Sequence, residues 1–384
     1  MRKFYFMSML LAILLVPVLS SCSSDDDDNG KGDYTEYPYS SLTPEQQKEK
    51  LAADANTFIT KVDGLSTSKG VKLISSLNDL PDLPDFTTSS ASDKKVKDSS
   101  IEKIIEINEF HGTYTWNFTT EDWDKTEATD KLTLLLPASE ASRLANKNDG
   151  KIEVTGVASE ATTDNGYRLP KELKALLFVD NANVGTINVS ATEVSADNYP
   201  KSANVSITLE DYTISMSAEK GSNNKTSFSF KKGNESLLEG TANLNGNLEE
   251  DKDYGESAAE VKIMDNLLVA HKGDLGKVFS EYEKIDVKYD DVDWTETIDK
   301  AYYEEKVAAW NNNMTSSLIS RKDETKIADI LSMLYVEKEG QYTYYDQVPA
   351  FKFNDDTIVD MEVYFGKGFD NVLSNWEDFI NKFF

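Results

Sequence analysis

The chain has 384 residues, of which 39% are hydrophobic, and a formal net charge of −28. A surface this acidic repels phosphate backbones, whose binding needs clustered lysine and arginine, so nucleic acid is excluded as a partner. The length predicts two domains, and one cysteine with two histidines excludes a multi-histidine zinc site.

The first residues have the layout of a secretory signal. Two basic residues at positions 2 and 3 precede an apolar run from Phe4 to Leu19. The run is shorter than the roughly 20 apolar residues that a membrane-spanning helix needs. We therefore expect residues 1–21 to be a cleaved signal peptide and the mature chain to have no transmembrane helix.

The end of this signal contains the only cysteine. The run Leu19-Ser20-Ser21-Cys22 resembles the lipobox of bacterial lipoproteins. The resemblance implies that Cys22 becomes the N-terminus and carries the lipid that anchors the protein. Two or three acyl chains hold a protein firmly, because each buried methylene contributes about 0.8 kcal/mol. The alternative is an incidental thiol, which would leave an unpaired cysteine in an exported protein.

An acidic run follows the predicted lipidation site. It consists of Ser23, Ser24, Asp25, Asp26, Asp27 and Asp28. The run resembles the export signal of surface lipoproteins in the Bacteroidota, which implies an outer-membrane location at the cell surface. A block of like charge is also typical of a solvated tether, and both interpretations can hold together. We expect residues 22–42 to be a flexible acidic tether.

Residues 43–250 are expected to form a domain of helices and antiparallel sheet. Thr43 and Gln46 form a predicted capping box around Pro44, apolar residues at helical spacing follow, and Gly64 is a predicted stop. A short second helix is predicted over Val71 to Leu77.

From about residue 112 to 248 the hydrophobic pattern changes to a period of two. Tyr114 and Trp116 alternate with threonines, and turn pairs such as Asn245-Gly246 separate the segments. This predicts an antiparallel meander with one wet face, in flat, curved or half-barrel form, and an α+β fold.

Residues 251–384 are expected to form a mainly helical domain with one β-hairpin. The predicted helices are Thr297–Ser317, Glu324–Leu334 and Phe369–Phe384. The predicted hairpin strands are Tyr342–Phe353 and Thr357–Phe365, turned at Asn354-Asp355-Asp356.

The remaining candidate sites are weak, and we predict no catalytic residue, metal or cofactor. The acidic stretches Asp290-Asp291-Val292-Asp293 and Asn148-Asp149-Gly150 lack the pattern of a calcium-binding EF-hand loop. His111 and His271 have no nucleophile elbow near them. Several aromatic residues provide either core packing or a ligand platform, and Trp123, between two aspartates, is the one expected to be exposed.

Three functions are compatible with these features. The leading hypothesis is a non-enzymatic lipoprotein that binds a small molecule, a glycan or an envelope protein. The second is a half-barrel carrier of an apolar ligand, which predicts a large dry cavity. The third is a carboxylate-based hydrolase, which predicts two acidic groups about 5 to 9.5 Å apart across a cleft.

Overall fold

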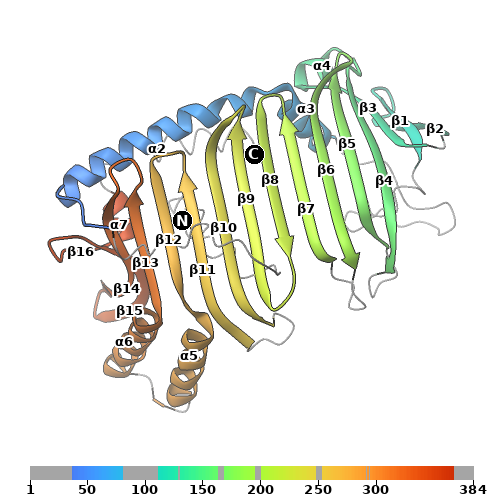
Figure 1. Ribbon diagram of the computed structural model, residues 1–384. Helices are drawn as coiled ribbons and strands as arrows, with labels where there is room; N and C mark the ends of the chain where they lie inside the picture. Colours follow the sequence, from blue (N-terminus) through green and yellow to red (C-terminus); the bar gives the residue numbers. More distant parts are fainter. Residues whose placement is uncertain are drawn as a thin grey trace. The chain divides into compact units, whose positions relative to one another are not determined.

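The computed structural model describes residues 37–80, 111–128, 130–162, 168–194, 200–247, 253–290, 292–293 and 295–366. These residues form six helices and sixteen strands, which confirms an α+β fold with a large antiparallel sheet (Figure 1). The predicted signal peptide, Cys22 and the acidic run at residues 23–28 lie outside the described residues. None of the helices in the described ranges is long and apolar enough to cross a membrane.

The helices and strands have the following bounds. The helices are α2 (Pro44–Thr67), α3 (Lys69–Asn78), α4 (Glu140–Leu144), α5 (Leu275–Tyr289), α6 (Glu296–Asn313) and α7 (Met361–Gly366). The first eight strands are β1 (Gly112–Asn117), β2 (Asp122–Thr126), β3 (Leu132–Leu136), β4 (Gly150–Thr162), β5 (Arg168–Val179), β6 (Ala182–Val194), β7 (Pro200–Leu209) and β8 (Tyr212–Glu219). The others are β9 (Asn223–Lys232), β10 (Glu235–Asn247), β11 (Asp253–Ile263), β12 (Leu267–Asp274), β13 (Met314–Ser320), β14 (Thr325–Glu339), β15 (Tyr342–Lys352) and β16 (Ile358–Asp360).

The strands form one open sheet. Their order is β16-β15-β14-β13-β12-β11-β10-β9-β8-β7-β6-β5-β4-β3-β1-β2. From β3 to β16 each strand lies beside the next one in the chain, so the predicted meander is confirmed and extends well beyond residue 248. The exception is at the other end, where β1 pairs parallel with β3 and antiparallel with β2.

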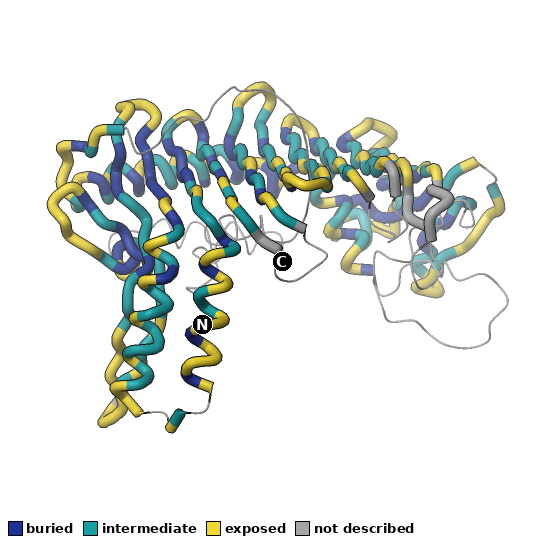
Figure 2. Tube along the Cα trace, turned by 60° about the horizontal axis from the view of Figure 1, so that its bottom comes forward, coloured by how far each residue is buried: buried dark blue, intermediate teal, exposed yellow. Residues whose placement is uncertain are grey.

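The chain divides into two compact units. Among the described residues, the first unit comprises residues 37–60, 218–228 and 236–366, and the second comprises residues 61–217 and 229–235. In both units many of the exposed residues lie at the turns between strands, and the buried residues of the sheet lie within the strands (Figure 2).

The predicted capping box of α2 is present. The Thr43 N–H donates to the Gln46 side chain, and the Gln46 N–H donates to the Thr43 hydroxyl at 3.3 Å. The predicted stop at Gly64 is wrong, because the helix continues to Thr67. A Cβ atom at Gly64 would lie 2.6 Å from the Tyr212 hydroxyl oxygen, so glycine serves there for close packing.

The expectation of a mainly helical C-terminal region is wrong. Glu324–Leu334 lies within β14, and the end of the predicted helix Thr297–Ser317 is β13. Lys326, Ile327 and Ala328 are all buried in succession. A strand covered on both faces lacks the alternation that identifies a strand from sequence, which explains the error. The predicted helix Phe369–Phe384 lies outside the described residues.

The predicted hairpin near the C-terminus is confirmed in part. Its first strand is β15, but its second, β16, ends at Asp360, where α7 begins. Phe351 in β15 is 2% exposed and packs edge-on against Tyr364 of α7 at 5.3 Å between ring centroids. The helix thus covers the apolar side of the hairpin.

Candidate ligand-binding cavity

A cavity of about 360 Å³ lies within the first unit, between one face of strands β10 to β15 and the helices α5 and α6. The helices contribute Leu275, Tyr282 and Trp310. The sheet contributes mainly small and apolar side chains together with a few polar ones: Asn243, Leu244, Ser257, Ala258, Ala259, His271, Ser316, Ile330, Leu331, Ser332, Gln347, Val348 and Pro349.

The strand register brings the central residues of this wall together. Ala259 on β11 lies opposite His271 on β12, which lies opposite Ser316 on β13, which lies opposite Ile330 on β14. Directly opposed residues of antiparallel strands face the same side of a sheet. Four strands therefore present one row of side chains to the cavity.

Two helices flank the cavity: α5 begins directly after β12 ends, and α6 ends directly before β13 begins. Asp274 caps α5, because its carboxylate accepts from the Lys277 N–H at 3.0 Å. Leu275 and Val278 of α5 then pack with Leu244 and Met314 of the sheet, and Trp310 of α6 packs against this cluster. Figure 1 shows α5 following β12 and α6 preceding β13.

His271 is held in the wall of the cavity as a neutral ring. Its Nδ1 atom and the Ser316 hydroxyl oxygen share a hydrogen bond of 2.5 Å, and its ring lies 6.0 Å from the Trp310 ring at an angle of 33°. Burial lowers the pKa of His271 from 6.5 to about 4, since removal from water disfavours the charged form.

A second polar pair links α5 to β15. The Tyr282 hydroxyl and the side-chain amide of Gln347 are in hydrogen-bond contact, at 2.9 Å to the amide oxygen and 2.7 Å to the amide nitrogen. Burial raises the pKa of Tyr282, which keeps the phenol protonated. The pair joins helix and sheet through uncharged groups.

Ser332 is the third polar feature. Its backbone N–H donates to the Asn311 side-chain oxygen at 2.8 Å, and its carbonyl accepts from the Asn311 amide at 2.8 Å. Its side chain differs, because the Ser332 hydroxyl oxygen is buried and has no hydrogen-bond partner in the described part of the chain. The residue as a whole is 5% exposed.

These features define what the cavity can hold. Among the described residues, the lining includes no aspartate, glutamate, lysine or arginine, and its histidine, His271, is neutral at pH 7. A charged ligand would therefore lose its hydration without gaining a counter-charge, which is costly. The volume falls within the range of about 300–1,000 Å³ that is typical of small-molecule sites.

The structure places the candidate residues that the sequence predicted in different parts of the molecule. His271 lines the cavity, whereas His111 precedes β1 in the second unit and is not part of the lining. Trp123 is half-buried rather than exposed, since it packs edge-on against Trp116 at 5.5 Å. Of the acidic stretch at 290–293, Asp291 lies outside the described residues.

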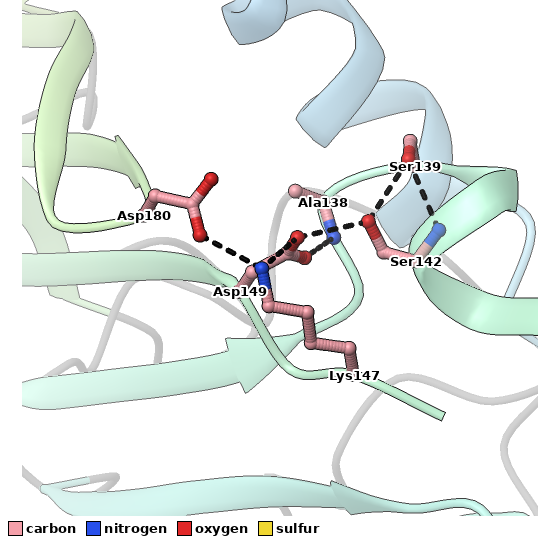
Figure 3. A network of polar contacts seen from close by, with 6 residues as sticks. All are labelled: Ala138, Ser139, Ser142, Lys147, Asp149 and Asp180. Carbon is pink, nitrogen blue, oxygen red and sulfur yellow. Dashed lines mark hydrogen bonds and ion pairs between the residues drawn. The ribbon is translucent and has the colours of Figure 1, made fainter. Parts of the chain in front are cut away.

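The other acidic stretch has a structural role in the second unit. The Asp149 carboxylate accepts from the Ala138 N–H at 2.9 Å and from the Ser142 hydroxyl at 3.0 Å, and it pairs with Lys147 (Figure 3). Burial alone would raise the pKa of Asp149, but these donors lower it. Among the described residues no group of three or more His, Cys, Asp and Glu side chains is placed to hold a metal ion.

Sequence reasoning missed most of the cavity. Ser316, Ser332 and Asn311 carry no motif, and Ser332 lies in the segment that was expected to be helical. Their roles depend on strand register, which single-sequence patterns specify poorly where both faces are covered.

The chain was also compared with known proteins. No family model, no curated protein and no solved structure matches it.

Proposed function

We propose that the protein is a lipid-anchored, non-enzymatic binding protein of the cell envelope that holds a small uncharged ligand in the cavity beneath α5 and α6. The observation that carries this proposal is the combination of an apolar lining with a few fixed polar groups, a composition typical of small-molecule sites. The anchor part of the proposal rests on the resemblance of the run ending at Cys22 to a lipobox.

Binding is favoured over catalysis by the chemistry of the lining. The pair His271 and Ser316 resembles a nucleophile with its base, but a triad also needs a third group that orients the base. In the part of the chain that the structure describes, no carboxylate lines the cavity to fill that role. Because no described carboxylate lines the cavity, this site gives no support to a hydrolase that uses two carboxylates.

The second candidate function is a carrier of an apolar ligand. The apolar lining is compatible with this function for a small ligand. A volume of about 360 Å³ lies near the lower end of the range for small-molecule sites. It suits a compact ligand better than a lipid with two long acyl chains.

The proposal is tested by filling the cavity. Ala259 is 7% exposed and lies centrally in the lining, so Ala259→Phe places a ring in the ligand space. We expect native mass spectrometry of protein purified from its own cells to show a bound small molecule in the wild type and not in this variant. Ala53→Phe, at an exposed position of α2, is the control.

Overpacking also costs stability, so each variant is first checked for a cooperative thermal unfolding transition. The same ligand occupancy in folded Ala259→Phe and in the wild type would contradict the proposal, as would no bound molecule in any of the proteins.

A further inference from the structure

One ring nitrogen of His271 has no hydrogen-bond partner among the described residues. The opposed pairs Ala259–His271 and His271–Ser316 place the ring on the sheet face that carries the cavity. The Nδ1 atom is bonded to Ser316, which leaves Nε2. Nε2 lies at the end of the imidazole ring away from Cβ, so in a side chain that stands up from the sheet it is the nitrogen farther from the strands.

This atom differs from the buried atoms that lack partners. In the described part of the chain those atoms are Gln47 Oε1, Asn148 Oδ1 and Ser332 Oγ, each with almost no accessible surface. His271 Nε2 is not one of them, and the residue as a whole is half-buried. A ligand in the cavity can therefore touch Nε2, whereas the Ser332 hydroxyl is out of its reach.

Asn243 belongs to the wall but directs its side chain elsewhere. It lies opposite Ala258, next to the row that joins Ala259 and His271. Its other neighbour in the chain, Leu244, packs against α5 on the cavity side. Because successive side chains of a strand point to opposite faces, the Asn243 amide points to the face that does not carry His271.

The other polar side chains near the cavity supply no competing preference. The Tyr282 hydroxyl bonds the Gln347 amide, and an amide both donates and accepts, so it favours neither kind of ligand group. The Ser257 hydroxyl contacts the Gly273 carbonyl at 3.5 Å. The Trp310 indole N–H has no partner among the described residues, and an indole nitrogen only donates.

The Ser316 hydroxyl decides which nitrogen of His271 carries the proton. Burial lowers the pKa of the ring to about 4, so at pH 7 one nitrogen donates and the other accepts. Within the described residues the buried Ser316 hydroxyl has no partner besides Nδ1. Donation from the hydroxyl to Nδ1 pairs both groups, whereas the reverse arrangement leaves the hydroxyl proton unpaired. The proton therefore lies on Nε2, and His271 presents an N–H donor to the cavity.

We infer that the cavity selects a compact, uncharged ligand with a flat apolar ring and a carbonyl oxygen that accepts a hydrogen bond from His271 Nε2. A carbonyl oxygen accepts without donating, which complements a wall whose uncommitted groups are N–H donors. Trp310 supplies a flat apolar surface, since its ring lies 6.0 Å from that of His271. This inference rests on the proposed function and specifies the ligand class of the same cavity.

The test uses two probes of the same shape: 2-acetylnaphthalene and 2-isopropenylnaphthalene, in which a CH₂ group replaces the carbonyl oxygen. Equilibrium dialysis of the purified full-length protein gives both dissociation constants, with Ala259→Phe as the blank for uptake outside the cavity. His271→Phe keeps a flat ring but has no N–H. It should shift the ratio of the two constants about tenfold against 2-acetylnaphthalene, since a buried carbonyl loses its donor. His111→Phe, the same substitution outside the lining, is the matched control and should keep the wild-type ratio.

NMR of protein labelled with ¹⁵N-histidine gives a readout that a merely structural role of the ring would not move. The chain has two histidines, so His111→Phe assigns the signals of His271. Nε2 should carry the proton in the ligand-free protein. The signal of this proton should move further downfield with 2-acetylnaphthalene than with 2-isopropenylnaphthalene. Because the ring is the wild-type one, this test holds even if His271→Phe does not fold.

The outcomes separate the two levels of the argument. The inference about His271 is wrong if the proton lies on Nδ1, if folded His271→Phe keeps the wild-type ratio, or if neither probe binds. Equal uptake by the wild type and Ala259→Phe would place the probes outside the cavity and would also overturn it. The proposed function is decided separately, by whether native mass spectrometry finds a bound molecule in the wild type and not in Ala259→Phe.

Discussion

The side-chain amide of Asn311 closes a two-bond ring with the backbone of Ser332, with both hydrogen bonds at 2.8 Å. The hydrogen-bonded ladder between β13 and β14 ends at Ser316 and Ile330, and the Asn311 side chain takes the place of the next strand residue. The arrangement joins the end of α6 to β14, and thus joins one wall of the cavity to the other.

Removing this amide should loosen the connection. We expect Asn311→Ala to lower the free energy of unfolding by about 1–2 kcal/mol, because two hydrogen bonds from this exposed side chain to the backbone of Ser332 are lost. Urea denaturation measures the change. Asn312→Ala, at the exposed neighbouring position, is the control and should have little effect.

Two serines on adjacent strands should respond in opposite ways to the same substitution. Ser316→Ala removes the partner of His271 and should lower the free energy of unfolding by about 1–3 kcal/mol. Ser332→Ala removes a buried hydroxyl that has no partner and should leave stability unchanged or raise it slightly. Thermal and urea unfolding of both variants check this. An equal loss in both would show that the Ser332 hydroxyl is already bonded in the ligand-free protein.

The buried imidazole should make stability depend on pH. The folded-state pKa of His271 is about 4, below the unfolded value of 6.5, so the unfolded chain binds more protons between these values. His271 therefore does not reduce the free energy of unfolding above about pH 6.5. As the pH drops toward 4, its effect lowers that free energy by up to about 1.4 kcal/mol per pH unit.

Other groups titrate in this range as well, so the measurement is a comparison. Between pH 7 and 4 the wild type should lose on the order of 3 kcal/mol relative to His271→Gln in urea unfolding. The control is Asn312→Gln, an exposed substitution that changes no titratable group and should follow the wild type. Parallel curves for the wild type and His271→Gln would mean that the imidazole is solvated in the folded state.

The lipid anchor is tested at Cys22. Serine cannot accept the acyl group through sulfur, so the Cys22→Ser protein, once its leader is removed, should leave the envelope fraction, and it should carry no fatty-acid label. Cell fractionation with metabolic labelling by a fatty acid measures both effects. Ser23→Ala is the control, since it leaves the cysteine in place. Normal retention and processing of the Cys22→Ser protein would refute the lipoprotein proposal.

Local signals in the sequence predicted the elements that local interactions define. The capping box of Thr43 and Gln46 placed the start of α2 correctly, and alternation at Tyr114 and Trp116 identified β1. These features depend on residues a few positions apart, which a single sequence displays directly.

Features that depend on tertiary contacts were not predictable in this way. Gly64 was expected to end a helix, but its lack of a side chain serves the approach of Tyr212, which is distant in sequence. The contact between Ser332 and Asn311 depends on where the β13–β14 ladder ends, which the sequence alone does not display. His271 was identified as a candidate, but its burial and its Ser316 partner required the fold.

The strand order has a consequence for how the sheet is assembled. From β3 onward each strand pairs with its immediate successor in the chain, so most new pairings need only a short connection to close, and the long one, between β12 and β13, contains α5 and α6. A polypeptide that emerges with its N-terminus first can add strands one after another to an edge that already exists. The cavity lies on β10 to β15, so under this sequential scheme it is completed after the strands that precede it have paired.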